Sequence, residues 1–130
     1  MKVICKHANG NRFSQGQLPI GFNPVSQTNL ILDKEYLVMG IYLFKQHIYY
    51  LVDENSKPYW FPCILFEISD SRINADWHIK ITNTDNSLES FQGYFELCYV
   101  EGYNNRLMER DEEEMRTYFK QKIATEESFS

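Results

Sequence analysis

The sequence predicts an α+β fold that is mainly β: a small, partly open SH3-like antiparallel barrel with a C-terminal helix. Aromatic residues make up 15% of the 130 residues, and rings, like β-branched side chains, favour strands. Alanine, the strongest helix former, is scarce. Short apolar runs follow one another closely between glycines, prolines and polar turns, as in small barrels. A plain α+β sheet with the helix across one face is the alternative fold.

A short first strand is expected over residues 3–8, with Val3 and Cys5 on one face. Residues 9–29 hold several glycines and prolines among polar residues. Such a composition predicts a long irregular loop between the first strand and the rest of the barrel.

The next segments predict a hairpin of two apolar strands. Residues 36–44 are almost continuously apolar, and Gly40 in the middle indicates a bulge or a sharp bend. Residues 45–46 form the turn, and residues 47–52 are the returning strand. Residues 53–58 are polar and end in proline, which predicts a loop.

Three further strands complete the expected barrel. Residues 59–61 form an aromatic strand that Pro62 ends, and residues 64–68 are another apolar run. Residues 76–83 alternate between apolar and polar side chains, which is typical of a half-buried strand. Its buried face would hold Trp77, Ile79 and Ile81.

The character of the chain changes after Asn83. Residues 84–90 predict a polar loop, and the segment from Gly93 onward is ambiguous between a strand and a short helix. Asp111, followed three residues later by Glu114, fits a capping box and predicts the start of a helix.

This C-terminal helix repeats large side chains at helical spacing, so that one face would pack on the barrel. The face holds Met115, Tyr118, Phe119, Lys122 and Ile123. The tail, residues 125–130, is expected to fray. The length fits a single domain over residues 1–124, with the barrel core at about 30–83 and the helical part at about 93–124.

The charge of the chain argues against a nucleic-acid partner. Thirteen Lys and Arg stand against eighteen Asp and Glu, for a net charge of −5, whereas affinity for phosphates comes largely from Lys and Arg. The acidic residues concentrate at Glu109, Asp111, Glu112, Glu113 and Glu114. An acidic surface attracts a basic protein partner and repels anionic membranes, and simple solubility is the alternative explanation.

Three widely spaced cysteines, Cys5, Cys63 and Cys98, show no zinc-binding spacing. We therefore expect no metal or other cofactor. The N-terminus lacks the apolar stretch of a signal peptide, and no segment is long and apolar enough to span a membrane. Reduced thiols in a cytoplasmic protein are the expectation.

No residue constellation identifies a reaction. Cys63 lies in an apolar run and lacks a neighbour that would lower its pKa, so we predict that it is a thiol of the hydrophobic core. His47 and His78 are candidates for an acid–base pair in an RNase-like reaction, but nothing in the sequence brings them together. We therefore predict that the chain is not an enzyme.

Aromatic residues crowd the predicted hairpin and the strand after it. These are Tyr36, Tyr42, Tyr49, Tyr50, Tyr59, Trp60 and Phe61. Because side chains alternate across a strand, not all of them point inward. Exposed Tyr and Trp near acidic residues are good anchors for a protein partner; the alternative is that the rings are buried and only the hydroxyl groups reach water.

Several segments resemble a group of small bacterial SH3-like barrel proteins that are encoded beside polymorphic toxins. The similar segments are residues 32–36 (LDKEY), 40–41, 48–51 (IYYL), 60–62 (WFP), 65–72 (LFEISDSR) and Trp77. The resemblance covers roughly residues 30 to 80, with a looser echo at residues 93–97. Proteins of this group act as immunity proteins, including those of contact-dependent growth inhibition systems.

The resemblance and the charge imply an immunity protein that binds and neutralises a basic, nuclease-like toxin by covering its active site or substrate groove. We expect the partner-binding surface to include an acidic loop and neighbouring rings. Its residues would be Asp53, Glu54, Tyr59, Trp60, Glu67 and Asp70. Two alternatives remain: a module that binds a peptide or small ligand, and an RNA-processing enzyme that uses His47 and His78.

Overall fold

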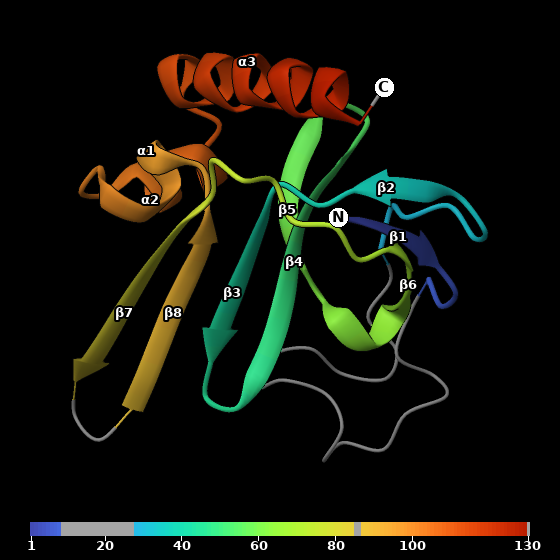
Figure 1. Ribbon diagram of the computed structural model, residues 1–130, viewed down its shortest axis with the longest axis horizontal. Coiled ribbons are helices and arrows are strands. Elements are labelled where there is room, and N and C mark those ends of the chain that lie inside the picture. Colours follow the sequence, from blue (N-terminus) through green and yellow to red (C-terminus); the bar gives the residue numbers. More distant parts are fainter. Residues whose placement is uncertain (9–27, 85–86, 130) are drawn as a thin grey trace.

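Two antiparallel sheets and three α-helices make up the part of the chain that the computed structural model describes, residues 1–8, 28–84 and 87–129 (Figure 1). The strand order is β2-β1-β6 in the smaller sheet and β5-β4-β3-β8-β7 in the larger. The fold is therefore α+β and mainly β, with a C-terminal helix, as predicted. The two sheets are not closed into a barrel, so the SH3-like arrangement is not confirmed. Most of the predicted loop over residues 9–29 lies outside the described residues.

The smaller sheet consists of β1 (Lys2–Cys5), β2 (Glu35–Leu37) and β6 (Phe66–Asp70). The larger sheet consists of β3 (Gly40–Phe44), β4 (His47–Glu54), β5 (Lys57–Pro62), β7 (His78–Thr84) and β8 (Ser87–Gly93). A short 3₁₀ turn, η2 (Cys63–Leu65), leads into β6. The helices are α1 (Phe95–Tyr99), α2 (Tyr103–Met108) and α3 (Glu112–Ser128).

The apolar run over residues 36–44 is divided between the two sheets rather than forming one strand. It supplies β2 and β3, and the chain crosses from one sheet to the other at Val38 and Met39, which are both fully buried. Gly40 begins β3 in regular register opposite Leu51 and Gly93, so no bulge lies there; of the two expectations for Gly40, the change of direction fits, since the chain passes from one sheet to the other immediately before it. The continuous apolar character of residues 36–44 fits this crossing, because Val38 packs into one hydrophobic core and Met39 into another.

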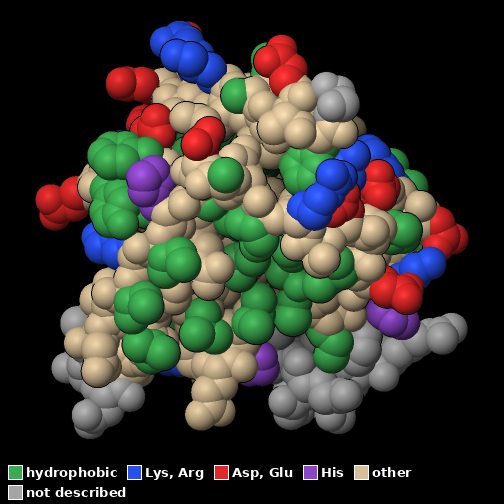
Figure 2. All heavy atoms as spheres, in the orientation of Figure 1, with side chains coloured by type: hydrophobic (Ala, Val, Ile, Leu, Met, Phe, Trp, Pro, Cys, Tyr) green, Lys and Arg blue, Asp and Glu red, His purple; other side chains and the backbone are tan. Residues whose placement is uncertain are grey.

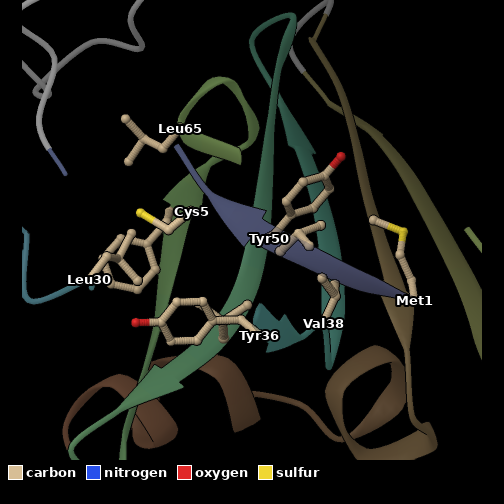
Figure 3. Packing of buried hydrophobic residues seen from close by; sticks show 10 residues of the cluster. Met1, Cys5, Leu30, Tyr36, Val38, Tyr50 and Leu65 are labelled. Carbon is tan, nitrogen blue, oxygen red and sulfur yellow. The ribbon is translucent and has the colours of Figure 1, made fainter. Parts of the chain in front are cut away.

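The crossing separates two hydrophobic cores. The first core lies between the two sheets (Figure 3), where Val3 and Cys5 point inward from one face of β1, as predicted. The second core lies between the larger sheet and the helices, and Leu51, Leu107 and Tyr118 are fully buried in it. The larger sheet is thus covered on one face by the smaller sheet and on the other by helices.

Two hairpins connect β3 to β4 and β4 to β5 by two-residue turns. The turn residues have left-handed backbone angles, with φ of 50° at Lys45 and 67° at Gln46, which is the geometry that matches the twist of a hairpin. The first turn confirms the prediction. The second turn comprises only Asn55 and Ser56, so the predicted loop over residues 53–58 is wrong because the strand pairing continues through Glu54 and Lys57.

The β7–β8 hairpin differs most from the prediction. Residues 84–90 were expected to form a loop, but Ser87 begins β8, which lies between β3 and β7 in the larger sheet. The strand predicted over residues 76–83 exists as β7 but is not half-buried, since Ile79 is 57% and Ile81 is 65% exposed. Alternation of side chains predicts a strand and does not by itself show what covers its apolar face.

Helix α3 begins one residue after Asp111, where the sequence predicts it. No capping box forms, because the Asp111 side chain makes no capping hydrogen bond and Glu114 pairs with Arg106 at 3.2 Å. The helix continues to Ser128 through part of the predicted frayed tail, and Thr125 within that tail is buried. Across the described residues, none of the helices is both long and apolar enough to cross a membrane.

Candidate functional site

On the helix-covered face of the larger sheet, two neighbouring glycines lie under α1. Gly40 and Gly93 are opposite each other in register. A Cβ atom at Gly40 would lie 2.6 Å from Cδ2 of Leu97, and one at Gly93 would lie 2.8 Å from the same atom. The two glycines therefore let α1 rest directly on the sheet, and α1 and α2 overhang the next row of residues.

That next row is aromatic. Tyr49, Tyr42 and Phe91 are register partners across β4, β3 and β8. The rings of Tyr42 and Phe91 stack with centroids 4.4 Å apart, and Phe44 stacks on the other side of Tyr42 at 5.7 Å. We call these four half-buried residues, Tyr42, Phe44, Tyr49 and Phe91, the aromatic strip. Such cross-strand aromatic pairs stabilise the sheet beyond the area that they bury.

A groove of about 330 Å³ lies between the aromatic strip and the segment that joins α1 to α2. Tyr42 and Phe91 form part of its wall, and the charged residues along it are Lys80, Glu89 and Glu101. The Trp60 indole donates a hydrogen bond of 2.7 Å from Nε1 to Oδ1 of Asn104. This bond ties the start of α2 to the sheet and so fixes the end of the groove.

The Tyr42 hydroxyl is hydrogen-bonded to one of the carboxylates of the groove. This hydroxyl donates a hydrogen bond of 2.7 Å to Oε1 of Glu89. Burial and the neighbouring carboxylate raise the pKa of Tyr42, so the phenol stays protonated. Two carboxylates against one ammonium group leave the groove negative. Aromatic faces beside carboxylates suit apolar side chains and cationic groups.

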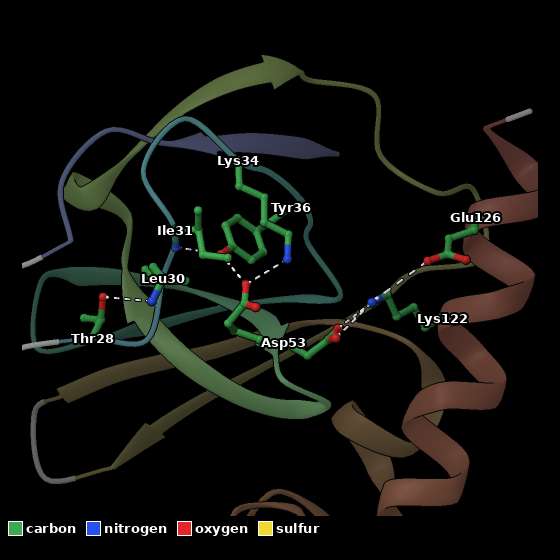
Figure 4. A network of polar contacts seen from close by, with 9 residues as sticks. Thr28, Leu30, Ile31, Lys34, Tyr36, Asp53, Lys122 and Glu126 are labelled. Atoms are coloured by element: carbon green, nitrogen blue, oxygen red, sulfur yellow. Dashed lines mark hydrogen bonds and ion pairs between the residues drawn. The ribbon is translucent and has the colours of Figure 1, made fainter.

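Two of the predicted partner-binding residues, Asp53 and Glu54, are largely buried, and Figure 4 shows Asp53 directed toward Lys122 of α3. They end β4 rather than lying on a loop. The Glu54 side chain is 8% exposed and accepts hydrogen bonds from the Tyr36 hydroxyl and, at 2.9 Å, from Lys34. These bonds hold the pKa of Glu54 below its usual range. Asp53, 10% exposed, pairs with Lys122 at 2.8 Å. Both carboxylates are thus already neutralised by contacts inside the fold.

The other four predicted residues do not form one surface. Tyr59 is 53% exposed on β5, whereas Trp60 points to the opposite face and is half-buried under α2. Glu67 is exposed on β6, at 4.0 Å from Lys6. Asp70 pairs with Arg72 at 2.6 Å, and this contact lowers the pKa of Asp70. The role of these four residues in binding a partner stays a prediction. Tyr59 and Glu67 are exposed enough to contact one.

The structure does not bring His47 and His78 together. Both point to the helix-covered side of the larger sheet, but β3 and β8 lie between their strands. In register, His47 lies in one row with Phe44 on β3, Glu89 on β8 and Thr82 on β7. His78 lies four residues before Thr82 along β7. With about 4.8 Å between strands and about 3.4 Å per residue, the two imidazoles are about 20 Å apart. One reaction cannot use both as acid and base at that distance.

The three thiols are free and have raised pKa values because they are buried. Cys5 and Cys98 are buried and Cys63 is half-buried, which confirms the prediction of small core residues. Within the described residues, no group of three His, Cys, Asp or Glu side chains is placed to hold a metal ion.

The sequence reasoning missed Glu89 and Phe91, the groove residues on β8. Residues 87–93 alternate, with Ser87, Glu89 and Phe91 on the groove side and Leu88, Ser90 and Gln92 on the other. This period of two was present in the sequence, but polar residues at most positions made it look like a loop. The pairing of Phe91 with Tyr42 depends on a register between segments far apart in the chain, which no local pattern shows.

The fold and the groove define a small, mainly β protein with an open aromatic groove on its larger sheet. No family model, curated protein or solved structure matches this chain. The resemblance to immunity proteins therefore stays a prediction.

Proposed function

We propose that this chain is an immunity protein that binds and neutralises a basic bacterial toxin, and that the aromatic groove is its contact surface. The toxin would be a nuclease-like domain, since such domains are basic in order to hold nucleic acid. Inhibition would come from covering the toxin's active site or substrate groove. This role requires a stable scaffold and a complementary surface, and no catalytic group.

The observation that carries this proposal is the aromatic strip at the edge of a negatively charged groove. Aromatic side chains are enriched at the energetic centres of protein interfaces, and charge complementarity speeds association and excludes wrong partners. A Lys or Arg side chain of the toxin would lie against Tyr42 and Phe91, with Glu89 and Glu101 as its counter-charges. The net charge of −5 also attracts a basic toxin, at distances longer than those of direct contacts.

The test is co-expression with the product of the neighbouring open reading frame. The neighbour should be toxic alone and harmless with this chain, and the two should co-purify. A harmless neighbour, or a toxic one that this chain neither binds nor neutralises, would overturn the proposed function.

Substitutions then locate the surface. Glu101→Lys places a positive charge at the exposed rim of the groove and should weaken binding by about tenfold or more. Glu113→Lys is the matched control: it makes the same charge change at an exposed position on α3 and should weaken binding by no more than about threefold. Equal effects of the two substitutions would show that only net charge matters and would remove the groove from the interface.

A second candidate function is the binding of a peptide or small ligand in the same groove. Its volume of about 330 Å³ falls at the lower end of ligand sites in proteins, at about 300–1,000 Å³. Low-micromolar binding of a Pro-rich peptide, abolished by Tyr42→Leu and unaffected by the control substitution Glu113→Lys, would favour this function over the inhibitor.

A further inference from the structure

The two edge strands of the larger sheet differ in how they are protected against pairing. At one edge, β5 carries Pro58 and Pro62, and proline on an edge strand blocks the addition of another strand. At the other edge, β7 runs for seven residues without a proline and with Lys80 as its one charged side chain. Among the described strands of this sheet, β7 is therefore the edge open to pairing.

The backbone groups that β7 presents to its free edge follow from the hairpin. Thr84 pairs with Ser87 across a two-residue connection, and the pair that flanks such a connection is hydrogen-bonded. Counting back from Thr84, every second residue (Thr82, Lys80 and His78) directs its main-chain N–H and C=O groups toward β8. The residues between them, Ile79, Ile81 and Asn83, direct theirs toward the free edge. The Tyr99 hydroxyl already donates to the Ile79 carbonyl at 3.0 Å. Ile81 and Asn83 are left for a partner strand.

The face of this sheet opposite the groove is aliphatic where the smaller sheet no longer covers it. Figure 2 shows hydrophobic side chains gathered over β7, β8, β3 and β4. By register and exposure they include Ile48 (42% exposed), Ile79 (57%), Ile81 (65%) and Leu88 (52%). On this face β3, β7 and β8 carry no charged residue. A patch of this kind at an open edge marks an interaction surface.

We propose that a second copy of this chain pairs with β7 through its own β7, antiparallel, about a two-fold axis that passes between the two Thr82 residues. Ile81 of each copy then lies opposite Asn83 of the other. Each of these two pairs exchanges both main-chain hydrogen bonds, which gives four bonds in all. The arrangement uses the outward groups that Tyr99 leaves free, and it joins two five-stranded sheets into one of ten strands.

Charge and shape both suit this symmetric pairing. Lys80 faces no like charge, since residue 84 of the second copy lies opposite it. Glu89 of the second copy is two strands away and two residues along, about 12 Å between Cα atoms. That distance is within the combined reach of a lysine and a glutamate side chain, so Lys80 of each copy attracts Glu89 of the other across the axis. On the other face, the aliphatic patches of the two copies become continuous, which buries part of each.

The first test is the mass of the purified chain in solution, which needs no toxin and is therefore independent of the proposed function. Analytical ultracentrifugation should give twice the 15.5 kDa chain mass. Ile81→Lys should give the monomer mass with unchanged circular dichroism. Ile123→Lys is the matched control, because Ile123 is 58% exposed on α3, and it should remain dimeric. A wild-type monomer at all concentrations up to about 1 mM, or open-ended assemblies, would overturn the pairing.

The second test fixes the register. In non-hydrogen-bonded antiparallel pairs, opposite Cα atoms are about 4.5 Å apart, close enough for a disulfide. Thr82→Cys should therefore form a covalent dimer on mild oxidation, and the wild-type chain with its three native cysteines should not. Ile81→Cys lies about 8 Å from its own counterpart in this register and should cross-link at least tenfold more slowly. A Thr82→Cys variant that stays monomeric on non-reducing gels would overturn the proposed two-fold pairing. If β7 pairs instead with a segment of a different protein, the purified Thr82→Cys chain does not cross-link to itself on oxidation, which also overturns the proposal.

Discussion

The hydroxyl group of Tyr118 on α3 donates a hydrogen bond of 2.7 Å to Oδ1 of Asp53 on β4. Tyr118 is fully buried, and burial together with the nearby carboxylate raises its pKa. Lys122, one turn further along α3, pairs with the same carboxylate at 2.8 Å. Asp53 therefore fixes the C-terminal helix to the end of a strand on the larger sheet.

Removing this carboxylate should destabilise the fold. Asp53→Ala leaves the Tyr118 hydroxyl buried without an acceptor and Lys122 without its partner, so we expect the free energy of unfolding to fall by about 1–3 kcal/mol. Asp53→Asn keeps an acceptor and should cost less. Urea unfolding followed by circular dichroism measures both. The exposed pair Glu112–Arg116 is the control, because Glu112→Ala should cost at most about 0.5 kcal/mol; a similar cost at both sites would contradict an internal role for Asp53.

Glu54 should make stability depend on acid pH. Its bonds to Tyr36 and Lys34 hold its pKa in the folded protein below the ordinary value of 4.5. A carboxylate with a lowered pKa stabilises the fold fully above its unfolded-state pKa and loses that contribution as the pH falls through the folded-state pKa. Glu54→Gln should therefore reduce the free energy of unfolding by about 1–2 kcal/mol at pH 7.

The same comparison repeated in acid separates charge from packing. The difference between the wild type and Glu54→Gln should shrink between about pH 5 and pH 3, as the wild-type carboxyl group becomes protonated. Glu67→Gln is the control, since this exposed residue should change stability little at any pH. A difference for Glu54→Gln that stays constant down to pH 3 would mean that the ionised carboxylate is not what stabilises the fold.

Asp53 and Glu54 show why a partner-binding surface is hard to predict from the sequence. Asp53 and Glu54 precede a polar segment with a proline, which is typical of a surface loop. Their partners Lys34, Tyr36 and Tyr118 come from distant segments, so neither burial nor pairing is visible locally. By contrast, the turn at Lys45 and the position of Asp111 before α3 depend on neighbouring residues, and both were predicted.

The fold class is also predictable from local patterns, whereas the order of the strands in the sheets is not. Aromatic and β-branched runs identify strands wherever they occur. That β8 lies between β3 and β7, and that the chain leaves one sheet for the other at Val38, depends on pairings between segments far apart in the chain. The open apolar faces of the larger sheet depend on those pairings as well, because exposure is decided by what covers a strand.

The three cysteines should be slow to react in the folded protein. Burial raises the pKa of Cys5, Cys63 and Cys98 above that of a free thiol, so little thiolate is present at pH 8. Labelling with Ellman's reagent should be at least about tenfold slower than in urea. Cys63, which is half-buried, should react first. Rapid labelling of Cys98 would contradict its burial between α1 and the larger sheet.

The contact between α1 and the sheet gives the sharpest packing test. Gly40→Ala would place a Cβ 2.6 Å from Leu97 Cδ2 and 3.1 Å from Trp60, so we expect a loss of about 1–3 kcal/mol in the free energy of unfolding. Leu97→Ala alone should cost about 2–5 kcal/mol through the cavity that it leaves. The double variant should lose less than the sum, because the shortened side chain makes room for the new methyl group. Gly93→Ala is the matched comparison: its Cβ also lies 3.0 Å from the Met39 carbonyl oxygen, which is backbone and cannot be relieved by truncating Leu97. Full additivity for Gly40→Ala with Leu97→Ala would show that the clash is absorbed elsewhere, and that α1 does not rest on these glycines.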